Sequence, residues 1–366
     1  MSFSAHDEQM MRRALRLADR GRNSVSPNPA VGCVIADATG VVGEGYHERA
    51  GDAHAEVNAL RAAAGAASGA TAFVTLEPCN THGRTPPCVD ALIAAGVQRV
   101  VFAMQDPNPA VSGNGAQRLR DAGILVEHGL MHDAAQALNP GYIMRMQANN
   151  PRVTLKIAAS LDGATAMGTG ESQWITGDAA RRDVQRLRAA SCAVMTGIGT
   201  VLADDPSLNV RGDGLGNLGR QPMRVVLDTA LRMPSRARMF ALEGQTLIMT
   251  AATDIARLAE AGVSVTRLTT DAQGQLDLAQ VMRALAERGV NEVLVEAGRT
   301  LCGSLLAAQL VDRIVLYMAP KLLGSETQGL IRTPNWITLA QGQSLAIEDV
   351  RRVGDDLRII AMPISG

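Results

Sequence analysis

The chain has 366 residues, of which 46% are hydrophobic and 19% charged, which is enough for two or three domains with sizeable cores. Its formal net charge of −1 argues against a nucleic-acid partner, because binding through phosphate neutralisation favours a basic surface. A small phosphorylated substrate needs only one or two well-placed arginines and is not excluded.

The N-terminus is charged and amphipathic, and no run of about 18 apolar residues occurs, so we expect neither a signal peptide nor a membrane span. The five cysteines are scattered along the chain, and no export signal precedes them. They indicate a reducing cytoplasm rather than a disulfide framework.

The first part of the chain alternates predicted helices and strands. An apolar face formed by Met11, Leu15 and Ala18 predicts a helix that ends at Gly21. The elements that follow are strands at 30–36 and 41–47, a helix at 54–67, a strand at 71–77, a helix at 88–96, a strand at 99–104, a helix near 114–122, a strand at 124–128 and a helical pattern at 140–147. This alternation is typical of an α/β layer fold with a substantially parallel sheet.

The polar stretch 147–152, which includes Pro151, interrupts this pattern before it restarts. We therefore predict two domains, 1–148 and 151–366. The second contains predicted strands at 152–160, 192–197, 224–228, 246–250, 291–298 and 313–320, and predicted helices at 178–190 and 277–289.

Two cysteines, a histidine and a glutamate stand at the ends of predicted elements. His54 and Glu56 begin one helix, Cys79 follows a strand, and Cys88 begins a helix after two prolines. Each part alone is uninformative, because His-x-Glu is common by chance and two cysteines could form a disulfide or lie in a core. Together they supply three ligands that zinc prefers, a free position for water, and in Glu56 a carboxylate that can carry a proton. The other cysteines are expected to be small buried side chains: Cys33, Cys192 and Cys302.

This combination of a histidine, a glutamate and two cysteines is the arrangement of zinc deaminases, but the spacing of the two cysteines differs from that of the nucleoside and tRNA enzymes. Eight residues lie between them in TLEPCNTHGRTPPC (75–88), where nucleoside and tRNA deaminases have two. This stretch resembles the deaminase domain of bacterial bifunctional riboflavin biosynthesis proteins. The resemblance extends over SPNPAVGCVI (26–35), GEGYHERAGDAHAE (43–56) and DPNP (106–109).

This resemblance implies a cytidine-deaminase-like three-layer domain that binds zinc. It also implies that Asn28 and His47 line the pyrimidine pocket and that Arg84 meets the substrate. The family often has Ser-His after the first cysteine, whereas this chain has Asn80-Thr81, so the contact of that histidine to the base is not carried over.

The second domain has no G-x-G-x-x-G after a strand, so the ordinary dinucleotide-binding fingerprint is not indicated. It resembles instead the reductase half of the same proteins, which is related to dihydrofolate reductase and has an α/β fold. The matching stretches are KIAASLDGATA (156–166), ESQWITG (171–177), ARRDVQRLRA (180–189), TGIGTVLADDPSLNVR (196–211), VEAG (295–298) and APKLLG (319–324).

The resemblance also implies which residues of the second domain bind ligands. Those expected to contact the nicotinamide nucleotide are Ala158, Trp174, Thr200 and Asp204. Those expected to contact the substrate are Ser172, Arg188, Leu208, Arg211 and Glu296. In addition, Gly298 lies where a strand leads into a helix, so its backbone can bind a cofactor phosphate.

Simple chemistry supports two of these residues and leaves alternatives open. Arg188 and Arg211 offer the bidentate forks that suit a ribose phosphate. However, Arg188 shares a predicted helix with three other arginines and could lie on a solvated face. Trp174 could be an ordinary packing residue, and Asp204 could belong to a turn.

The resemblance implies a bifunctional cytoplasmic enzyme of riboflavin biosynthesis. Zinc-hydroxide hydrolytic deamination of 2,5-diamino-6-ribosylamino-4-pyrimidinone 5′-phosphate would precede NADPH-dependent reduction of its ribosyl group to ribityl. The product would be 5-amino-6-ribitylamino-uracil 5′-phosphate. Asp204, Glu296 or an ordered water could donate the proton in the reduction. We also expect a homo-oligomer, with the number of subunits left open.

Two other functions are compatible with parts of the pattern. A nucleoside or tRNA-type zinc deaminase with an unrelated C-terminal domain would share the zinc ligands, but the long insert between the cysteines and the near-neutral charge speak against it. A non-catalytic zinc module would not need Glu56, because structural zinc sites close with a fourth protein ligand.

Overall fold

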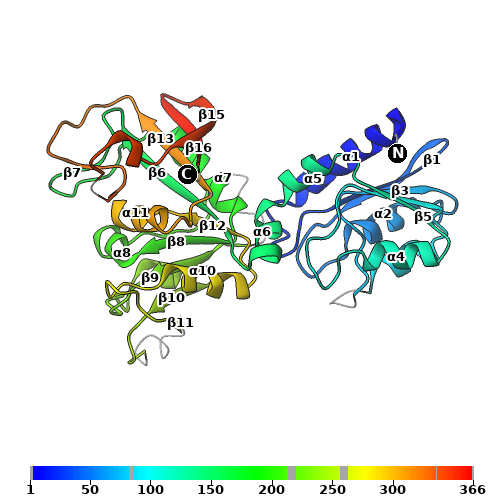
Figure 1. Ribbon diagram of the computed structural model, residues 1–366, viewed down its shortest axis with the longest axis horizontal. Helices are drawn as coiled ribbons and strands as arrows, with labels where there is room; N and C mark the ends of the chain where they lie inside the picture. The colour runs from blue at the N-terminus through cyan, green and yellow to red at the C-terminus, as the bar shows by residue number, and fades with distance from the viewer. Residues whose placement is uncertain (1–2, 82–85, 213–219, 256–262, 335, 365–366) are drawn as a thin grey trace. The chain divides into compact units, whose positions relative to one another are not determined.

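The computed structural model describes residues 3–81, 86–212, 220–255, 263–334 and 336–364. The chain divides into two compact units, Met1–Asn150 and Pro151–Gly366, which are drawn in Figure 1. Among the described residues, every helix is too short or too polar to span a bilayer.

The first unit is a three-layer α/β structure. Its sheet has the strand order β2-β1-β3-β4-β5, in which β1 pairs antiparallel with β2 and β3, while β3, β4 and β5 are parallel. Its strands are β1 (Gly32–Asp37), β2 (Gly40–Tyr46), β3 (Thr71–Val74), β4 (Arg99–Phe102) and β5 (Leu125–His128). Its helices are α1 (Ala5–Gly21), α2 (Ala55–Ala63), α3 (Cys88–Ala94), α4 (Asn114–Asp121), α5 (His132–Leu138) and α6 (Pro140–Ala148).

Alternate residues of the strands face two separate cores, as the strand period of two requires. Cys33 and Ile35 of β1 pack with α2, α3 and α4 on one face, whereas Val34 and Ala36 pack with α1 and α5 on the other. Figure 1 shows the same division, with α1 and α5 above the sheet and α2 and α4 below it.

The helix that carries His54 and Glu56 lies unusually close to the sheet. A Cβ atom at Gly43 of β2 would stand 2.3 Å from the carbonyl oxygen of Ala59, in the middle of α2. Only glycine permits this approach, which fixes the height of α2 above the strands. The first turn of α2 is thereby held beside the ends of the strands.

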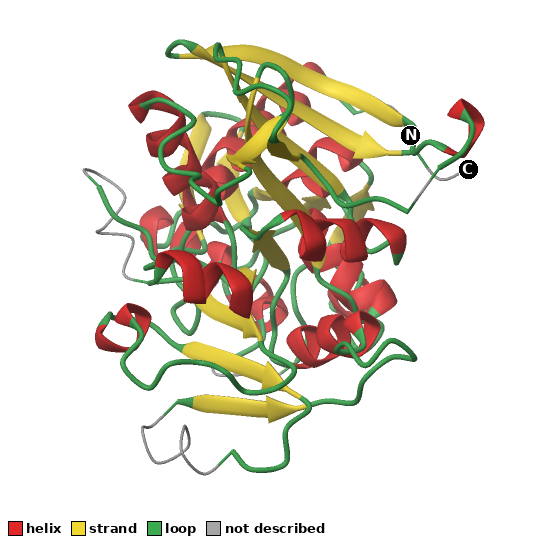
Figure 2. Cartoon of the chain, turned by 90° about the vertical axis from the view of Figure 1, so that its left-hand side faces the viewer, coloured by secondary structure: helices red, strands yellow, loops and turns green. Residues whose placement is uncertain are grey.

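The second unit is built on one large sheet with helices on both faces (Figure 2). Its order is β11-β10-β9-β8-β12-β6-β13-β16-β15, parallel from β11 to β13 and antiparallel over the last two pairings. The strands are β6 (Arg152–Ser160), β8 (Ala193–Gly197), β9 (Met223–Leu227), β10 (Thr246–Thr250), β11 (Ser264–Arg267), β12 (Glu292–Val295), β13 (Arg313–Ala319), β15 (Leu345–Val353) and β16 (Asp356–Pro363). A separate antiparallel pair joins β7 (Ala164–Met167) and β14 (Thr327–Gly329).

Two pairs of helices cover this sheet. The helices are α7 (Asp178–Ala190), α8 (Ile198–Asp204), α10 (Leu278–Glu287) and α11 (Arg299–Ala307), with short 3-10 helices at η1 (Arg238–Ala241) and η2 (Leu339–Gln341). Side chains of α10 and α11 share one core, and those of α7 and α8 belong to cores on the other face. Because the strands from β11 to β13 are parallel, their carboxyl ends lie at one edge of the sheet, and α/β proteins bind their ligands at that edge.

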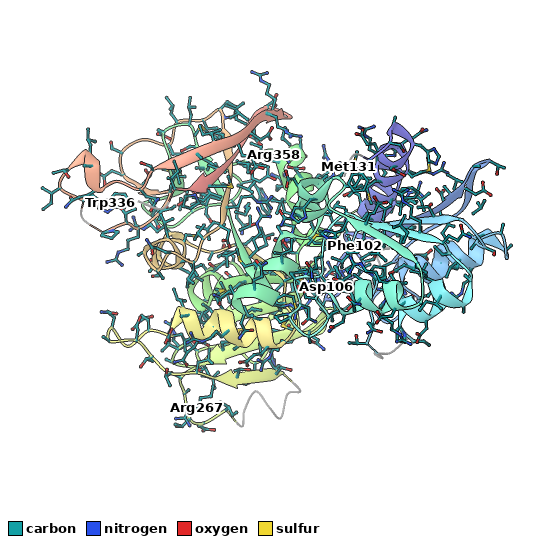
Figure 3. The ribbon with its side chains drawn as sticks, turned by 45° about the vertical axis from the view of Figure 1, so that its right-hand side comes forward. Phe102, Asp106, Met131, Arg267, Trp336 and Arg358 are labelled. Carbon is teal, nitrogen blue, oxygen red and sulfur yellow. The ribbon has the colours of Figure 1, made fainter. Side chains whose placement is uncertain are left out.

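The helix α7 is fixed to the antiparallel part of the sheet. The buried Asp183 carboxylate accepts hydrogen bonds from the Tyr317 hydroxyl at 2.7 Å and from Arg358 Nη1 at 2.8 Å. Arg358 comes from β16, where Figure 3 labels it. This network sets the position of the helix that carries Arg188.

Most predicted elements appear, several with the predicted bounds, as for β6, α7 and β10. The first sheet is less parallel than predicted, because the hairpin of β1 and β2 makes half of its pairings antiparallel. The sequence pattern missed α5, α8 and the strands β7, β11 and β14 to β16.

Candidate active sites

Three predicted metal ligands converge in the first unit. His54 is the N-cap of α2, Cys79 lies in the loop beyond β3, and Cys88 is the first residue of α3. His54 Nδ1 lies 3.2 Å from Cys88 Sγ and 3.5 Å from Cys79 Sγ, and all three ligand atoms lie within 4.8 Å of one another. Within the described ranges, this is the one cluster of three or more possible metal ligands.

These separations suit zinc. A tetrahedral ion with Zn–S and Zn–N bonds of about 2.3 and 2.05 Å separates its sulfur and nitrogen ligands by about 3.6 Å. The two nitrogen–sulfur distances, 3.2 and 3.5 Å, are close to that value. Three protein ligands of this type leave the fourth coordination position for water, as in catalytic zinc sites.

The first turn of α3 holds the two cysteines together. The backbone N–H of Cys88 donates to Cys79 Sγ at 3.4 Å, and the N–H of Val89 donates to the Cys79 carbonyl at 3.3 Å. A hydrogen bond from the Cys88 side chain lowers the pKa of the Cys79 thiol. The lowered pKa favours the thiolate, which is the form that binds metal ions.

Glu56 lies beside the ligands without being one of them. It is the second residue of α2, and only 3% of its surface is exposed. Burial raises the pKa of its carboxyl to about 7, and the charge of Cys79 adds to the effect. A nearby dication would favour the ionised form. Such a carboxylate can take up and return a proton near neutral pH.

Asn28 and His47 form one hydrogen-bonded unit next to the ligands. His47 Nδ1 lies 3.1 Å from the Ala53 carbonyl, so it carries the proton, and His47 Nε2 then accepts from Asn28 Nδ2 at 3.0 Å. The rings of His47 and His54 meet edge to face, with centroids 5.2 Å apart. The structure thus brings both predicted pocket residues to the metal ligands, whereas Arg84 lies outside the described residues.

The second unit contains an open cleft of about 1990 Å³ at the carboxyl edge of its parallel strands. Small-molecule sites typically measure about 300–1,000 Å³, so this cleft has room for a cofactor and a substrate together. Its lining includes every ligand residue predicted for this unit: Ala158, Ser172, Trp174, Arg188, Thr200, Asp204, Leu208, Arg211, Glu296 and Gly298.

A buried ion pair stands at the centre of this cleft. Arg188 Nε donates to Glu296 Oε1 at 2.5 Å and Nη2 to Oε2 at 2.9 Å, with the two side chains 9% and 11% exposed. Arg188 is therefore not on a solvated face, and part of its fork is occupied by a carboxylate. Burial alone would raise the pKa of Glu296, but Arg188 and Lys156 outweigh it and hold that pKa below its ordinary value.

Arg211 has the more accessible guanidinium. It lies at the exposed side of the cleft, where its Nη1 contacts Asn209 Oδ1 at 3.2 Å. Its backbone N–H donates to Gln185 Oε1 at 3.0 Å, which ties its loop to α7. Among the described residues, the hydrogen bonds of Arg211 go to Asn209 and Gln185 and not to a carboxylate.

Lys156 is a member of this site that the sequence pattern did not single out. It lies in the middle of β6, lines the cleft, and is close enough to Glu296 for the two charges to interact. Burial is the main reason that its pKa lies below the ordinary value. A lysine between Leu155 and Ile157, in the middle of a mostly buried strand, was the available signal, because such a charge needs a partner or a function.

The segment 172–176 lines one side of the cleft. Trp174 is 62% exposed, and the Arg181 guanidinium lies 4.7 Å from its ring centroid. Gln173 Nε2 donates to Asp204 Oδ1 at 3.2 Å, and Lys321 Nζ donates to the Trp174 carbonyl at 3.2 Å. Trp174 is therefore not a core residue, and Asp204 ends α8 rather than standing in an isolated turn.

Gly298 is the N-cap of α11, so the first backbone N–H groups of that helix lie at the cleft just after β12.

Taken together, the first unit has the cluster and the buried carboxylate of a zinc-dependent deaminase, and the second has the large polar cleft of a nucleotide-dependent reductase.

Comparison with known proteins agrees with both assignments. Residues 4–104 match the family model described as the cytidine and deoxycytidylate deaminase zinc-binding region, and residues 151–358 match the RibD C-terminal domain. The riboflavin biosynthesis protein RibD of Escherichia coli is 51% identical over 96% of this chain and 98% of its own length. That of Bacillus amyloliquefaciens is 40% identical over 98% and 97%.

Solved structures extend the likeness to the whole fold. A structure of Acinetobacter baumannii RibD superposes with a TM-score of 0.92 at 43% identity, covering 98% of this chain and 99% of the other. The Thermotoga maritima diaminohydroxyphosphoribosylaminopyrimidine deaminase/5-amino-6-(5-phosphoribosylamino)uracil reductase superposes with a TM-score of 0.85 at 31% identity, with the same coverage. The chain therefore belongs to the family of the riboflavin biosynthesis protein RibD. It is a bifunctional enzyme of riboflavin biosynthesis, with a deaminase that uses zinc and a reductase that uses NADPH.

Proposed function

We propose that the first unit deaminates 2,5-diamino-6-ribosylamino-4-pyrimidinone 5′-phosphate and that the second reduces the ribosyl group of the product to ribityl. The observation that carries the first step is the cluster of His54, Cys79 and Cys88 with the buried Glu56 beside it. The Thermotoga maritima relative is described as a deaminase and reductase of these phosphorylated pyrimidines, which supports the choice of substrate. A single-domain nucleoside deaminase with an unrelated tail is not favoured, because the likeness covers both units.

In the deamination, zinc held by the three ligands supplies a water of lowered pKa. Glu56 takes the proton of this water at its carboxylate and returns a proton to the departing amine. The burial of Glu56 keeps bulk water from competing for that proton. Asn28 is oriented by His47, which uses its amide N–H and leaves its carbonyl oxygen for the pyrimidine ring.

In the reduction, NADPH supplies the hydride. The backbone N–H groups at Gly298 and the start of α11 bind its diphosphate, while Trp174 and Thr200 position the rest of the cofactor. Arg211 binds the phosphate of the substrate. Glu296, fixed in orientation by Arg188, accepts hydrogen bonds from the sugar hydroxyls.

We assign the proton donor of the reduction to Lys156. Glu296 is held ionised by Arg188 and is a poor acid at neutral pH. Asp204 is exposed and accepts a hydrogen bond from Gln173. Lys156, by contrast, has a pKa lowered by burial, which makes its ammonium group a stronger acid than an exposed lysine.

We further propose that the chain works in the cytoplasm as a homo-oligomer on free small molecules. Cys79 and Cys88 must stay reduced to bind zinc, and they are free in the structure. The strand β15, at the edge of the sheet, exposes Leu345, Ile347 and Val350, which are suitable for contact with another subunit. Light scattering of the purified protein measures the subunit number, and a monomer at all concentrations would contradict this assignment.

The substrate assignment is tested by incubating the purified protein with the diaminopyrimidine phosphate and measuring product masses. Without NADPH we expect the mass of an amino-to-hydroxyl exchange and released ammonia; with NADPH we expect two further hydrogens. An unchanged substrate would contradict the proposed deamination, and a deaminated product that NADPH does not alter would contradict the proposed reduction.

Arg211→Ala tests the phosphate contact in the same assay. A charge-assisted hydrogen bond is worth about 1.5–3 kcal/mol. The KM of the reduction for the deaminated intermediate should therefore rise about 10- to 150-fold. Arg236→Ala, an exposed arginine of the same unit outside the cleft lining, is the matched control. An equal effect of both variants would remove Arg211 from the phosphate site.

A further inference from the structure

The residue after the first cysteine ligand departs from the family pattern, and the structure shows what it contacts. Asn80 Oδ1 accepts a hydrogen bond from Arg118 Nη1 at 2.7 Å. Arg118 comes from α4, 38 positions further along the chain. The side chain that follows Cys79 is therefore engaged by a neighbouring helix rather than directed to a base.

The same arginine also reaches the segment of the second cysteine. Arg118 Nη2 forms an ion pair with Asp90 Oδ1, and Asp90 lies in the first turn of α3, two residues after Cys88. One guanidinium thus contacts both segments that supply sulfur ligands. Because its two nitrogens are fixed in one plane, it restrains the separation of those segments.

The helix that carries Arg118 is itself firmly anchored beside Cys79. The buried Glu77 carboxylate accepts from the backbone N–H groups of Gly113 at 3.0 Å and Ala116 at 3.1 Å, at the start of α4. A Cβ atom at Gly115 would stand only 2.0 Å from the Pro78 carbonyl oxygen, so helix and loop are in direct contact.

Glu77 also fixes a second loop at this place. Its carboxylate accepts from the backbone N–H of Asp106, which Figure 3 labels beyond the end of β4. The base of α4 is therefore a rigid support from which Arg118 extends toward the metal ligands.

We propose that Arg118 is a positioning residue of the metal centre, which holds the Cys79 and Cys88 segments at the separation that zinc requires and so slows the loss of the metal. This inference rests on the proposed zinc site of His54, Cys79 and Cys88. It acts through the backbone of the ligand segments, because Arg118 contacts no ligand atom among the described contacts.

The effect should be moderate. Partners that hydrogen-bond directly to metal ligands typically change metal affinity about 10- to 100-fold. Arg118 contacts Asn80 and Asp90, which lie near the ligands in the chain, and not the ligands themselves. Its ion pair with Asp90 is also partly exposed, with side chains 44% and 38% accessible. We expect Arg118→Ala to release zinc about 3- to 10-fold faster, below the range of direct partners.

The test is the rate at which the zinc-loaded full chain gives up its metal to an excess of a chromogenic chelator. Arg118→Ala should release zinc faster, and Arg118→Lys, which can hold only one of the two partners, should fall between it and the parent. Arg120→Ala is the matched control, since Arg120 is exposed on the same helix and makes neither contact. The unfolding midpoint of the chelated protein is the second readout and should be the same for Arg118→Ala and the parent.

Several outcomes would overturn the inference. Equal release rates for Arg118→Ala and the parent would do so, as would an equal acceleration in Arg120→Ala. If Arg118→Ala does not fold, Asn80→Ala and Asp90→Asn remove one contact each, and parent-like rates in both would reject the role. A parent chain that holds no zinc would instead refute the metal site itself. Failure of the zinc site can therefore be told apart from failure of the role of Arg118.

Discussion

Individual residues of the metal site owe their properties to where their helices begin. His54 caps α2 and Cys88 opens α3, so both side chains project beyond helix ends instead of along helix flanks. A spacing of two residues on a helix flank would direct His54 and Glu56 apart. At a helix start it lets His54 join the cluster of possible metal ligands while Glu56 stays buried beside it.

The ligand set makes a direct prediction. Cys88→Ser should lose most of the zinc of the purified protein, because a serine hydroxyl is a much weaker zinc ligand than a thiolate. Cys192→Ser, in the second unit, should keep the parent zinc content. Metal analysis of both variants decides the matter, and full zinc in Cys88→Ser would rule out this ligand set.

The role of Lys156 as proton donor makes a prediction with two variants. Lys156→Gln should lower the kcat of NADPH oxidation about 10²- to 10⁴-fold, the usual cost of losing a general acid. Lys156→Arg keeps the charge but remains protonated at all working pH values, so it should not restore the rate. Steady-state kinetics with the deaminated intermediate measures both, and a fully active Lys156→Arg would show that only the charge matters.

The site residues were predictable from sequence to different degrees. The cluster of His54, Cys79 and Cys88 could be anticipated because the three residues stand at predicted element boundaries within a short stretch of chain. Arg188 and Glu296 form their ion pair 108 positions apart, so no local pattern revealed it. Lys156 and Arg118 were missed for the same reason, since their partners come from distant elements that only the fold brings together.

Elements with a clear apolar period were predicted well, and those that depend on tertiary contacts were not. The strand β6 and the helix α7 have the predicted bounds because each carries a long, regular pattern. The strand β15 was missed because most of its residues are exposed and its pairing with β16 supplies the stability. The helix α8 has seven residues and buries only Ile198 and Val201, which are too few to define an apolar period.

An ion pair between Asp7 and Arg99 adds to the apolar contacts that hold α1 on the sheet of the first unit. Asp7, in the first turn of α1, accepts from Arg99 Nη1 at 2.7 Å and also from the Ser4 backbone N–H at 3.0 Å. The hydrogen bond from Arg99 lowers the pKa of Asp7 from 3.8 to about 2. Asp7 therefore stabilises the fold above the pKa of the unfolded chain, and this contribution is lost as the pH falls from about 4 toward 2.

Asp7→Asn should lower the free energy of unfolding at pH 7 by about 1–2 kcal/mol, a value reduced from the full pKa difference because solvent screens the partly exposed Arg99. The deficit should shrink below about pH 4, where Asp7 of the unfolded chain takes up a proton while the folded carboxylate is still ionised. Glu8→Gln, which removes an exposed ion pair with Arg12 on the same helix, should change stability by at most about 0.5 kcal/mol. Urea unfolding between pH 7 and pH 3 measures these differences, and a pH-independent deficit in Asp7→Asn would refute the ionic explanation.

On the scale of the whole molecule, two units with separate cores carry two different chemistries. One has a metal-ligand cluster, and the other has a cleft for a dinucleotide and a phosphorylated sugar. Within the part of the chain that the structure describes, the cores of the first unit contain no residue beyond Asn150, and those of the second contain none before Pro151. Damage to the chemistry of one site should therefore leave the other site intact.

A dual assay of Glu56→Gln tests most directly whether the deaminase and reductase sites work independently. The variant should keep its zinc and lose ammonia release by about 10²- to 10⁴-fold, because the carboxylate that moves the proton is gone. With the already deaminated intermediate, the same preparation should oxidise NADPH at the parent rate. Loss of both activities in a folded, zinc-loaded protein would contradict two independent sites, and parent-like ammonia release would show that Glu56 is not the proton carrier.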